Sequence, residues 1–397
     1  MFHRRPSGGG FNSRTSSFGR RSSSRRGAPS SSIHESKYIK KAIGLAEEAP
    51  FIPQTAFADL PVNDHLKANI SRAGFVTPTP IQDASILPIM SGKNLIGIAN
   101  TGTGKTAAFL IPLIEKIVKD KNQRVIILVP TRELAVQIQS QMRSLTQSMN
   151  IYSALCIGGS FMRDQIHDLR RNPQFVIGTP GRIKDFVNRR ILNLATFNNV
   201  VLDEVDRMLD MGFIADIKYL MAQFPVQRQS LFFSATISPP IHALIQNFVP
   251  DPVMVSVKKQ ETVNNVDQDV VRVQAGMQKM DVLEDLLKKE EFKKVIIFGR
   301  TKHGVERLSL NLFKKGFKVA SIHGDKTQSK RNYAIRLFKD NVVSILVATD
   351  VASRGIDIAD ITHVINFDQP ATYDDYVHRI GRTGRANKKG VALTFLD

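Results

Sequence analysis

The chain has 397 residues, a length that favours two or three domains, and 42% of them are hydrophobic, which is enough for ordinary cores. No apolar run approaches the roughly 18 residues that a membrane-spanning helix needs, so the sequence predicts no such helix. The formal net charge of +19 favours a polyanionic partner, most simply nucleic acid, with a merely soluble basic chain as the alternative.

The chain has one cysteine, Cys156, and so can form no internal disulfide. A lone cysteine with scattered histidines also builds no zinc site. Cys156 lies in an apolar run, so we interpret it as a buried structural thiol rather than a nucleophile. A reducing compartment fits this cysteine usage, and we take the cytoplasm as the default location.

Residues 1–32 are rich in Ser, Gly and Arg, and seven arginines precede the first acidic residue, Glu35. Because few apolar side chains are present, the pattern predicts a disordered tail, which we extend to residue 40. Phenylalanines among the arginines could stack on bases. The alternatives are a spacer without a role and an organelle transit peptide, but the run Gly8-Gly9-Gly10 argues against the helix that a transit peptide needs.

Residues 41–82 read as a connector, a helical stretch and a proline-punctuated loop that ends at Gln82. A glutamine amide donates and accepts hydrogen bonds at once, as recognition of the adenine edge requires. Phe75 could stack on the same base. This segment alone is weak support for a nucleotide site.

Residues 94–106 read NLIGIANTGTGKT, in which an apolar strand is followed by a glycine-rich loop and the start of an apolar helix. This is the context of a phosphate-binding loop, in which backbone N–H groups and a helix N-terminus face a polyphosphate. Lys105 would reach the outer phosphates and Thr106 would bind Mg²⁺. The usual pattern has glycine where this chain has Ala99, which is tolerable if that position is still part of the strand. A chance glycine-rich turn is the alternative.

After this loop, continuous apolar runs alternate with helical patterns, which predicts a doubly wound parallel sheet covered on both faces. We assign this first α/β domain to residues 83–257, a polar linker to 258–268, and a second α/β domain to 269–397. The runs of the first domain are Val125–Val129, Leu155–Ile157, Phe175–Ile177, Val200–Leu202, Leu231–Phe233 and Val253–Val257. Those of the second are Val270–Val273, Val295–Phe298, Val319–Ile322, Ile345–Val347, Val364–Ile365 and Val391–Phe395.

Two acidic residues, Asp203 and Glu204, directly follow one of these apolar runs. In a parallel sheet, the strand before them ends at the same edge as the strand before Lys105. Asp203 would hold Mg²⁺, commonly through water, and Glu204 would orient and deprotonate an attacking water. A solvated acidic loop is the alternative, and so apolar a preceding strand argues against it.

A series of short motifs follows in a fixed order along the chain. They are PTPIQ (78–82), ANTGTGKT (99–106), PTREL (130–134), GG (158–159), TPGR (179–182), DEVD (203–206), SAT (234–236), HGD (323–325), ATDVASRGID (348–357) and HRIGRTGR (378–385). This set resembles the DEAD-box RNA helicases over about residues 56–397. One departure is Val205, where the family name has Ala, and we expect it to be accommodated by packing.

The resemblance implies an ATP site, bound Mg²⁺ and a coupling motif. Nucleotide-binding positions would be Phe57, Phe75, Gln82, Thr101, Gly102, Thr103, Gly104, Lys105, Thr106 and Asp357. Thr106 and Asp203 would serve the metal, and Lys105, Glu204, Arg382 and Arg385 would serve catalysis, the two arginines acting on the γ-phosphate. Ser234 and Thr236 would couple hydrolysis to strand separation through Asp206 and His378.

The resemblance also implies contacts to the RNA sugar-phosphate backbone, which position RNA without reading its sequence. The matching positions are Arg132, Gly159, Thr179, Arg182, Arg300, Gly324, Gln328, Arg331 and Thr349.

We therefore predict two tandem RecA-like α/β domains that form a monomeric, ATP-dependent RNA helicase with no membrane association. A DNA translocase and an ATP-regulated RNA clamp or annealing factor are the alternatives.

Overall fold

The computed structural model describes residues 33–42, 51–100, 102–257, 265–274, 276–353, 358, 360–384 and 389–396. The predicted tail up to residue 32, most of the predicted linker, and the site residues Thr101, Asp357 and Arg385 lie outside the described residues. Within the described part of the chain, no helix is long and apolar enough to cross a membrane.

The first domain contains a seven-stranded sheet in which every strand pairing is parallel, as the sequence predicted. Its order is β3-β4-β2-β5-β6-β1-β7. The strands are β1 (Leu95–Ala99), β2 (Val125–Leu128), β3 (Ser153–Cys156), β4 (Phe175–Gly178), β5 (Asn199–Asp203), β6 (Gln229–Ser234) and β7 (Val253–Val257). Strands β5, β6 and β1 are neighbours in this order, so the loops that follow them begin at the same edge of the sheet.

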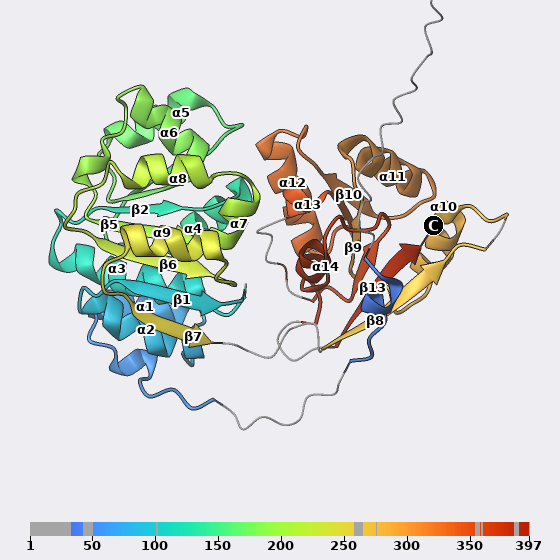
Figure 1. The fold of residues 1–397 in the computed structure, drawn as a ribbon, viewed down its shortest axis with the longest axis horizontal. Coiled ribbons are helices and arrows are strands. Elements are labelled where there is room, and N and C mark those ends of the chain that lie inside the picture. Colours follow the sequence, from blue (N-terminus) through green and yellow to red (C-terminus); the bar gives the residue numbers. More distant parts are fainter. Residues whose placement is uncertain are drawn as a thin grey trace, which may run out of the picture. The chain divides into compact units, whose positions relative to one another are not determined.

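Helices cover both faces of this sheet (Figure 1). Alternate strand residues enter two separate cores, with Ile127 in one and Ile126 and Leu128 in the other, because successive strand side chains point to opposite faces. The helices are α1 (Asp64–Arg72), α2 (Pro80–Met90), α3 (Lys105–Lys119), α4 (Arg132–Leu145), α5 (Met162–Arg170), α6 (Pro180–Asn188), α7 (Val205–Asp210), α8 (Ile214–Met221) and α9 (Pro239–Phe248). Short 3₁₀ helices are η2 (Phe57–Asp59) and η3 (Leu194–Thr196).

The second domain contains a six-stranded sheet of order β10-β11-β9-β12-β13-β8, again with parallel pairings only. Its strands are β8 (Val266–Arg272), β9 (Val295–Phe298), β10 (Val319–Ile322), β11 (Ile345–Ala348), β12 (His363–Asn366) and β13 (Gly390–Leu396). Its helices are α10 (Lys279–Leu287), α11 (Lys302–Lys314), α12 (Gln328–Lys339), α13 (Asp350–Ser353) and α14 (Tyr373–Ile380).

Two predicted boundaries are wrong. The sequence predicts a linker over 258–268, but β8 begins at Val266, because Val266 and Gln268 are buried where the strand pairs with β13. The predicted tail extends to residue 40, but Glu35–Tyr38 form the 3₁₀ helix η1 and Tyr38 is buried. Tyr38 is the one fully buried side chain among the described residues 33–42.

Candidate active site

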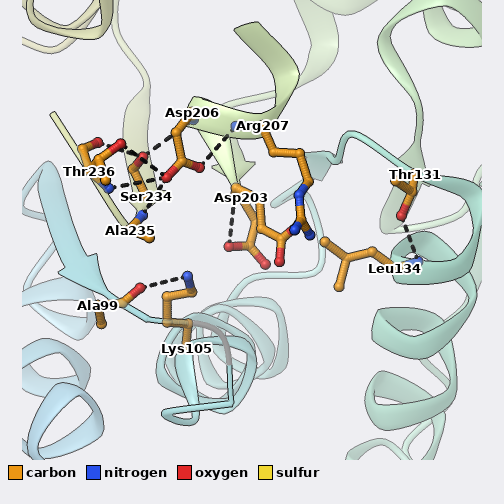
Figure 2. A network of polar contacts seen from close by, with 11 residues as sticks. Ala99, Lys105, Thr131, Leu134, Asp203, Asp206, Arg207, Ser234, Ala235 and Thr236 are labelled. Carbon is orange, nitrogen blue, oxygen red and sulfur yellow. Dashed lines mark hydrogen bonds and ion pairs between the residues drawn. The ribbon is translucent and has the colours of Figure 1, made fainter. Parts of the chain in front are cut away.

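The loop between β1 and α3 has the backbone of a phosphate-binding loop. Gly102 and Gly104 have φ values of 84° and 95°, a left-handed conformation that glycine adopts without strain. Gly104 is the N-cap of α3, so the first N–H groups of that helix face the loop. Lys105 is buried, and its Nζ donates to the carbonyl oxygen of Ala99 at 2.8 Å (Figure 2). Ala99 is the last residue of β1. This position is therefore still part of the strand, where a methyl group in place of the usual glycine was expected to be tolerated.

The acidic pair follows β5, and both carboxylates are buried. The backbone N–H of Glu204 donates to Asp203 Oδ1 at 2.9 Å. Burial raises the pKa of Asp203 to about 6, while the charge of Lys105 opposes this rise. Burial makes the ionised form of this carboxylate costly, so a cation nearby would stabilise that form.

Glu204 has a different environment from Asp203. Burial by itself raises the pKa of Glu204, but the charges of Arg207, Lys105 and Arg382 outweigh burial and hold the pKa below its ordinary value. Arg207 Nη1 lies 2.9 Å from Glu204 Oε2, and both side chains are buried. Glu204 also has a φ of 54°, an unusual backbone conformation for a residue with a side chain. Glu204 is therefore an ionised carboxylate in a fixed orientation.

Arg207 lies outside the sequence motifs that predict the site, directly after the acidic motif 203–206. Its only sequence signal is a position three residues after Glu204 at the start of a helix, where side chains share one face. Val205, the departure from the family motif, is fully buried in the core beneath α7, where its larger side chain is accommodated.

Asp206 links α7 to the loop after β6 (Figure 2). Its Oδ2 accepts from the backbone N–H groups of Ala235 and Thr236 at 2.9 and 3.1 Å, and from Thr236 Oγ1 at 3.3 Å. The backbone N–H of Asp206 donates to Ser234 Oγ at 3.3 Å. The carboxyl end of β5 and the loop after β6 are thus joined by one hydrogen-bonded network.

Gln82 lies beside the phosphate-binding loop. Its Oε1 accepts from the backbone N–H of Thr79 at 2.9 Å, and its Nε2 donates to the carbonyl oxygen of Gly104 at 3.1 Å. The predicted aromatic pair also lies together, with the rings of Phe57 and Phe75 in an edge-to-face contact at 5.8 Å. The glutamine that was expected to read adenine is therefore also bonded to the loop that would hold the phosphates.

Arg382 is the described catalytic candidate of the second domain, and its side chain is buried. It lines a small cavity together with Arg207, Asp375 and His378. With Arg207 and Lys105, its positive charge helps to hold the pKa of Glu204 below the ordinary value. The structure thus brings one predicted arginine and the predicted coupling histidine towards the acidic pair.

The predicted RNA contacts of the first domain gather at the loop after β3. A Cβ atom added to Gly158 would lie 2.9 Å from Arg132 Nη2, and one on Gly159 would lie still closer to this guanidinium. Glycine at both positions therefore lets Arg132 pack on the loop backbone. Gln165, which belongs to none of the sequence motifs, holds the same loop through two hydrogen bonds to the Ile157 backbone, at 3.1 and 3.0 Å.

Two other candidates of the first domain adjoin this loop. Arg182 Nη1 donates to Gln165 Oε1 at 3.2 Å. The backbone N–H of Thr179 donates to the carbonyl oxygen of Cys156 at 3.1 Å. Arg132, Gly159 and Arg182 thus lie around the loop after β3, and Thr179 is buried beside the end of that strand. Cys156 itself is buried, and burial raises the pKa of its thiol to about 12, as expected of a structural cysteine.

Gln328 and Arg331 have a partner that the sequence did not indicate. Gln328 Nε2 donates to Glu133 Oε1 at 2.9 Å, and Arg331 Nη2 lies 2.8 Å from the same oxygen. All three side chains are buried. In this structure, both residues predicted to contact RNA instead bind an acidic side chain of α4. Of the remaining candidates, Arg300 and Gly324 are exposed and Thr349 is half-buried.

The residues around Asp203 fit a nucleotide-bound Mg²⁺ ion. The described residues contain no cluster of three or more His, Cys, Asp or Glu side chains that could hold a metal. Mg²⁺ in nucleotide sites is commonly held by only one or two protein oxygens together with phosphates and waters. The buried Asp203 carboxylate, with its raised pKa, and the hydroxyl of Thr106 supply such a limited donor set.

Comparison with known proteins identifies the family. Residues 79–244 match the family model for DEAD/DEAH box helicases, and residues 278–387 match the model for the helicase conserved C-terminal domain. The chain is 45% identical over 342 residues to the DEAD-box ATP-dependent RNA helicase CshA of Bacillus subtilis, covering 86% of this chain and 69% of that protein. The chain belongs to the DEAD-box helicase family. An ATP-dependent RNA helicase CshA of Listeria monocytogenes shows the same identity over 345 residues, which are 86% of this chain and 66% of the relative.

Solved structures of DEAD-box proteins share the fold. Saccharomyces cerevisiae Dbp5 bound to RNA and ADP BeF3 aligns with a TM-score of 0.75 at 30% identity, covering 86% of this chain and 89% of Dbp5. A DEAD-box protein from Methanococcus jannaschii aligns with a TM-score of 0.51 at 39% identity, covering 87% of this chain and 94% of that one. This DEAD-box chain spans about two thirds of the length of the two CshA relatives.

Proposed function

We propose that this DEAD-box chain is an RNA-stimulated ATPase that hydrolyses ATP to ADP and phosphate and uses the cycle to separate short RNA duplexes or remodel RNA–protein complexes. The observation that supports this proposal most directly is that Arg382 of the second domain lines the same small cavity as Arg207, which is ion-paired with Glu204 at 2.9 Å. The charges of Lys105 and Arg382 also help to lower the pKa of Glu204. We further propose that the chain acts as a cytoplasmic monomer with Mg²⁺ and ATP and without a membrane.

In the proposed reaction, the loop backbone and Lys105 bind the β- and γ-phosphates, and Gln82 contributes to adenine recognition. Glu204 orients a water for in-line attack and accepts its proton at a carboxylate oxygen. Arg207 keeps this carboxylate ionised and aimed, since their 2.9 Å ion pair is buried. Bound Mg²⁺, held through Thr106 and Asp203, would neutralise charge on the phosphate oxygens.

Arg382 and Arg385 would stabilise the charge that develops on the transferred phosphoryl group. Because both follow the linker and Lys105 precedes it, hydrolysis would require the two domains to close on ATP. RNA bound by backbone contacts in both domains would favour the same closure, and so would stimulate hydrolysis. The network of Asp206 with Ser234 and Thr236 would then transmit the state of the nucleotide to the loop after β6.

The test is steady-state ATPase activity without nucleic acid, with single-stranded RNA, and with DNA of the same sequence. Stimulation by RNA alone is expected, because contacts to the 2′-hydroxyl distinguish RNA from DNA. Equal stimulation by DNA would favour a DNA translocase. No stimulation by either would contradict the proposed coupling of RNA binding to domain closure.

Lys105→Ala is expected to weaken ATP binding by about 10- to 100-fold, because a hydrogen bond to a charged group contributes about 1.5–3 kcal/mol. Equilibrium titration with a fluorescent ATP analogue measures the dissociation constant. Lys119→Ala is the matched control, since it removes the same charge from the exposed last turn of α3. Equal affinities of the two variants would refute the assignment of the loop.

A further inference from the structure

Residues 34–42, here called the N-terminal strap, precede the first domain in sequence but pack on the second. Lys40 and Gln268 form an antiparallel bridge, with N–H to carbonyl distances of 3.1 and 2.8 Å in the two directions. The backbone N–H of Ala42 also donates to Asp267 Oδ1 at 2.8 Å. Because β8 is the edge strand of its sheet, the strap satisfies backbone groups that would otherwise face water.

The strap buries one side chain, Tyr38, against helix α14. The Tyr38 ring is 1% exposed and meets the ring of Tyr376 edge-to-face at 4.8 Å. Next to it, Lys37 Nζ lies 5.0 Å from the centre of the Tyr373 ring. Tyr376 is itself fully buried and donates its hydroxyl hydrogen to Gln268 Oε1 at 2.9 Å. The strap, β8 and α14 thus form one packed unit.

A second residue of helix α14, Arg379, also fixes the position of the helix. Arg379 Nε and Nη2 bind the two carboxylate oxygens of Asp350 at 2.6 and 2.8 Å, and Nη1 donates to the carbonyl oxygen of Asp368 at 2.7 Å. The helix contains His378 and ends directly before the turn that carries Arg382. Two anchors therefore fix the direction in which this end of the helix presents its side chains. One is Arg379 and the other is the contact of Tyr376 with Tyr38.

We propose that Tyr38 is a positioning residue for the active site, which holds α14 so that Arg382 is correctly oriented for phosphoryl transfer. This inference rests on the proposed role of Arg382. Truncation of Tyr38 would leave the Tyr376 ring uncovered on the strap side and remove an aromatic contact that orders α14. The nucleotide-binding loop lies in the first domain, so ATP affinity would not depend on Tyr38.

Residues Gln54 and Thr55, which come after the strap in sequence, contact the first domain. The backbone N–H groups of Gln54 and Thr55 donate to the carboxylate oxygens of Asp83, at 3.0 and 3.1 Å. Asp83 follows the predicted adenine-binding Gln82 directly.

The test uses the full chain with Tyr38→Ala, Tyr38→Phe and, as matched control, the neighbouring Ile39→Ala, whose side chain is half exposed. Tyr38→Ala is expected to lower the RNA-stimulated kcat about tenfold with little change in KM for ATP, because even a 1 Å misplacement can cost about 100-fold in rate. Tyr38→Phe should retain the wild-type kcat, since the Tyr38 hydroxyl has no hydrogen-bond partner among the described residues. Ile39→Ala should also match the wild type.

Two further measurements complete the test. Thermal unfolding shows whether each variant is folded, and Tyr38→Leu replaces Tyr38→Ala if the latter is not. The double variant Tyr38→Ala/Arg382→Ala should be hardly slower than Arg382→Ala alone, because Tyr38 acts through Arg382. The inference would be overturned if Tyr38→Ala left kcat unchanged, or if Tyr38→Phe lost as much activity as Tyr38→Ala. It would also be overturned if the double variant showed the full additional loss. Normal hydrolysis by Arg382→Ala would instead overturn the proposed function of Arg382.

Discussion

Arg382→Ala should slow single-turnover ATP hydrolysis in saturating RNA by about 10³- to 10⁵-fold, the range known for arginines that contact a transferred phosphoryl group. The physical reason is that the guanidinium neutralises charge that is largest in the transition state. The side chain is buried, and its charge helps to lower the pKa of Glu204. Rapid-quench measurement of phosphate release from bound ATP gives the rate.

The control for this variant is Arg307→Ala, which removes an exposed arginine of α11 in the same domain. It should hydrolyse ATP at the wild-type rate. If both variants slowed hydrolysis equally, the loss would reflect the general basic charge of the domain, and the specific role of Arg382 would be refuted.

Glu204→Gln is expected to retain ATP and RNA binding but to slow hydrolysis by about 10²- to 10⁴-fold, the usual contribution of a general base. Glutamine has nearly the same shape and still accepts a hydrogen bond from Arg207, but it cannot take the proton of the attacking water. Single-turnover hydrolysis and a parallel RNA-binding titration with ATP measure the two properties separately.

Glu115→Gln is the matched control for this second variant. Glu115 is also a buried carboxylate, and it lies on α3, the helix that begins at Lys105. It accepts a hydrogen bond from the backbone N–H of Asn63 at 2.8 Å. Hydrolysis by Glu115→Gln should be unaffected. If Glu204→Gln turned over ATP as fast as this control, Glu204 would not be the general base.

The parts of the fold that the sequence predicted well have local signals. The strand, loop and helix around Lys105 were visible because apolar runs and glycines report backbone conformation directly. The acidic pair after β5 was visible for the same reason. Because the sheet is parallel, this pair and the loop at Lys105 then had to meet at one edge of the sheet. β8 was misplaced because an edge strand needs few apolar residues, so its first part reads as polar linker.

The sequence by itself determined two parallel-sheet domains, the phosphate-binding loop, the acidic pair and the order of the family motifs. It did not determine which side chains meet over long separations in the chain. Only the tertiary structure paired Arg207 with Glu204, placed Gln328 and Arg331 on Glu133, and set Tyr38 against Tyr376. A motif reports the local conformation of its own segment, whereas such contacts depend on how separate segments pack, which no local pattern encodes.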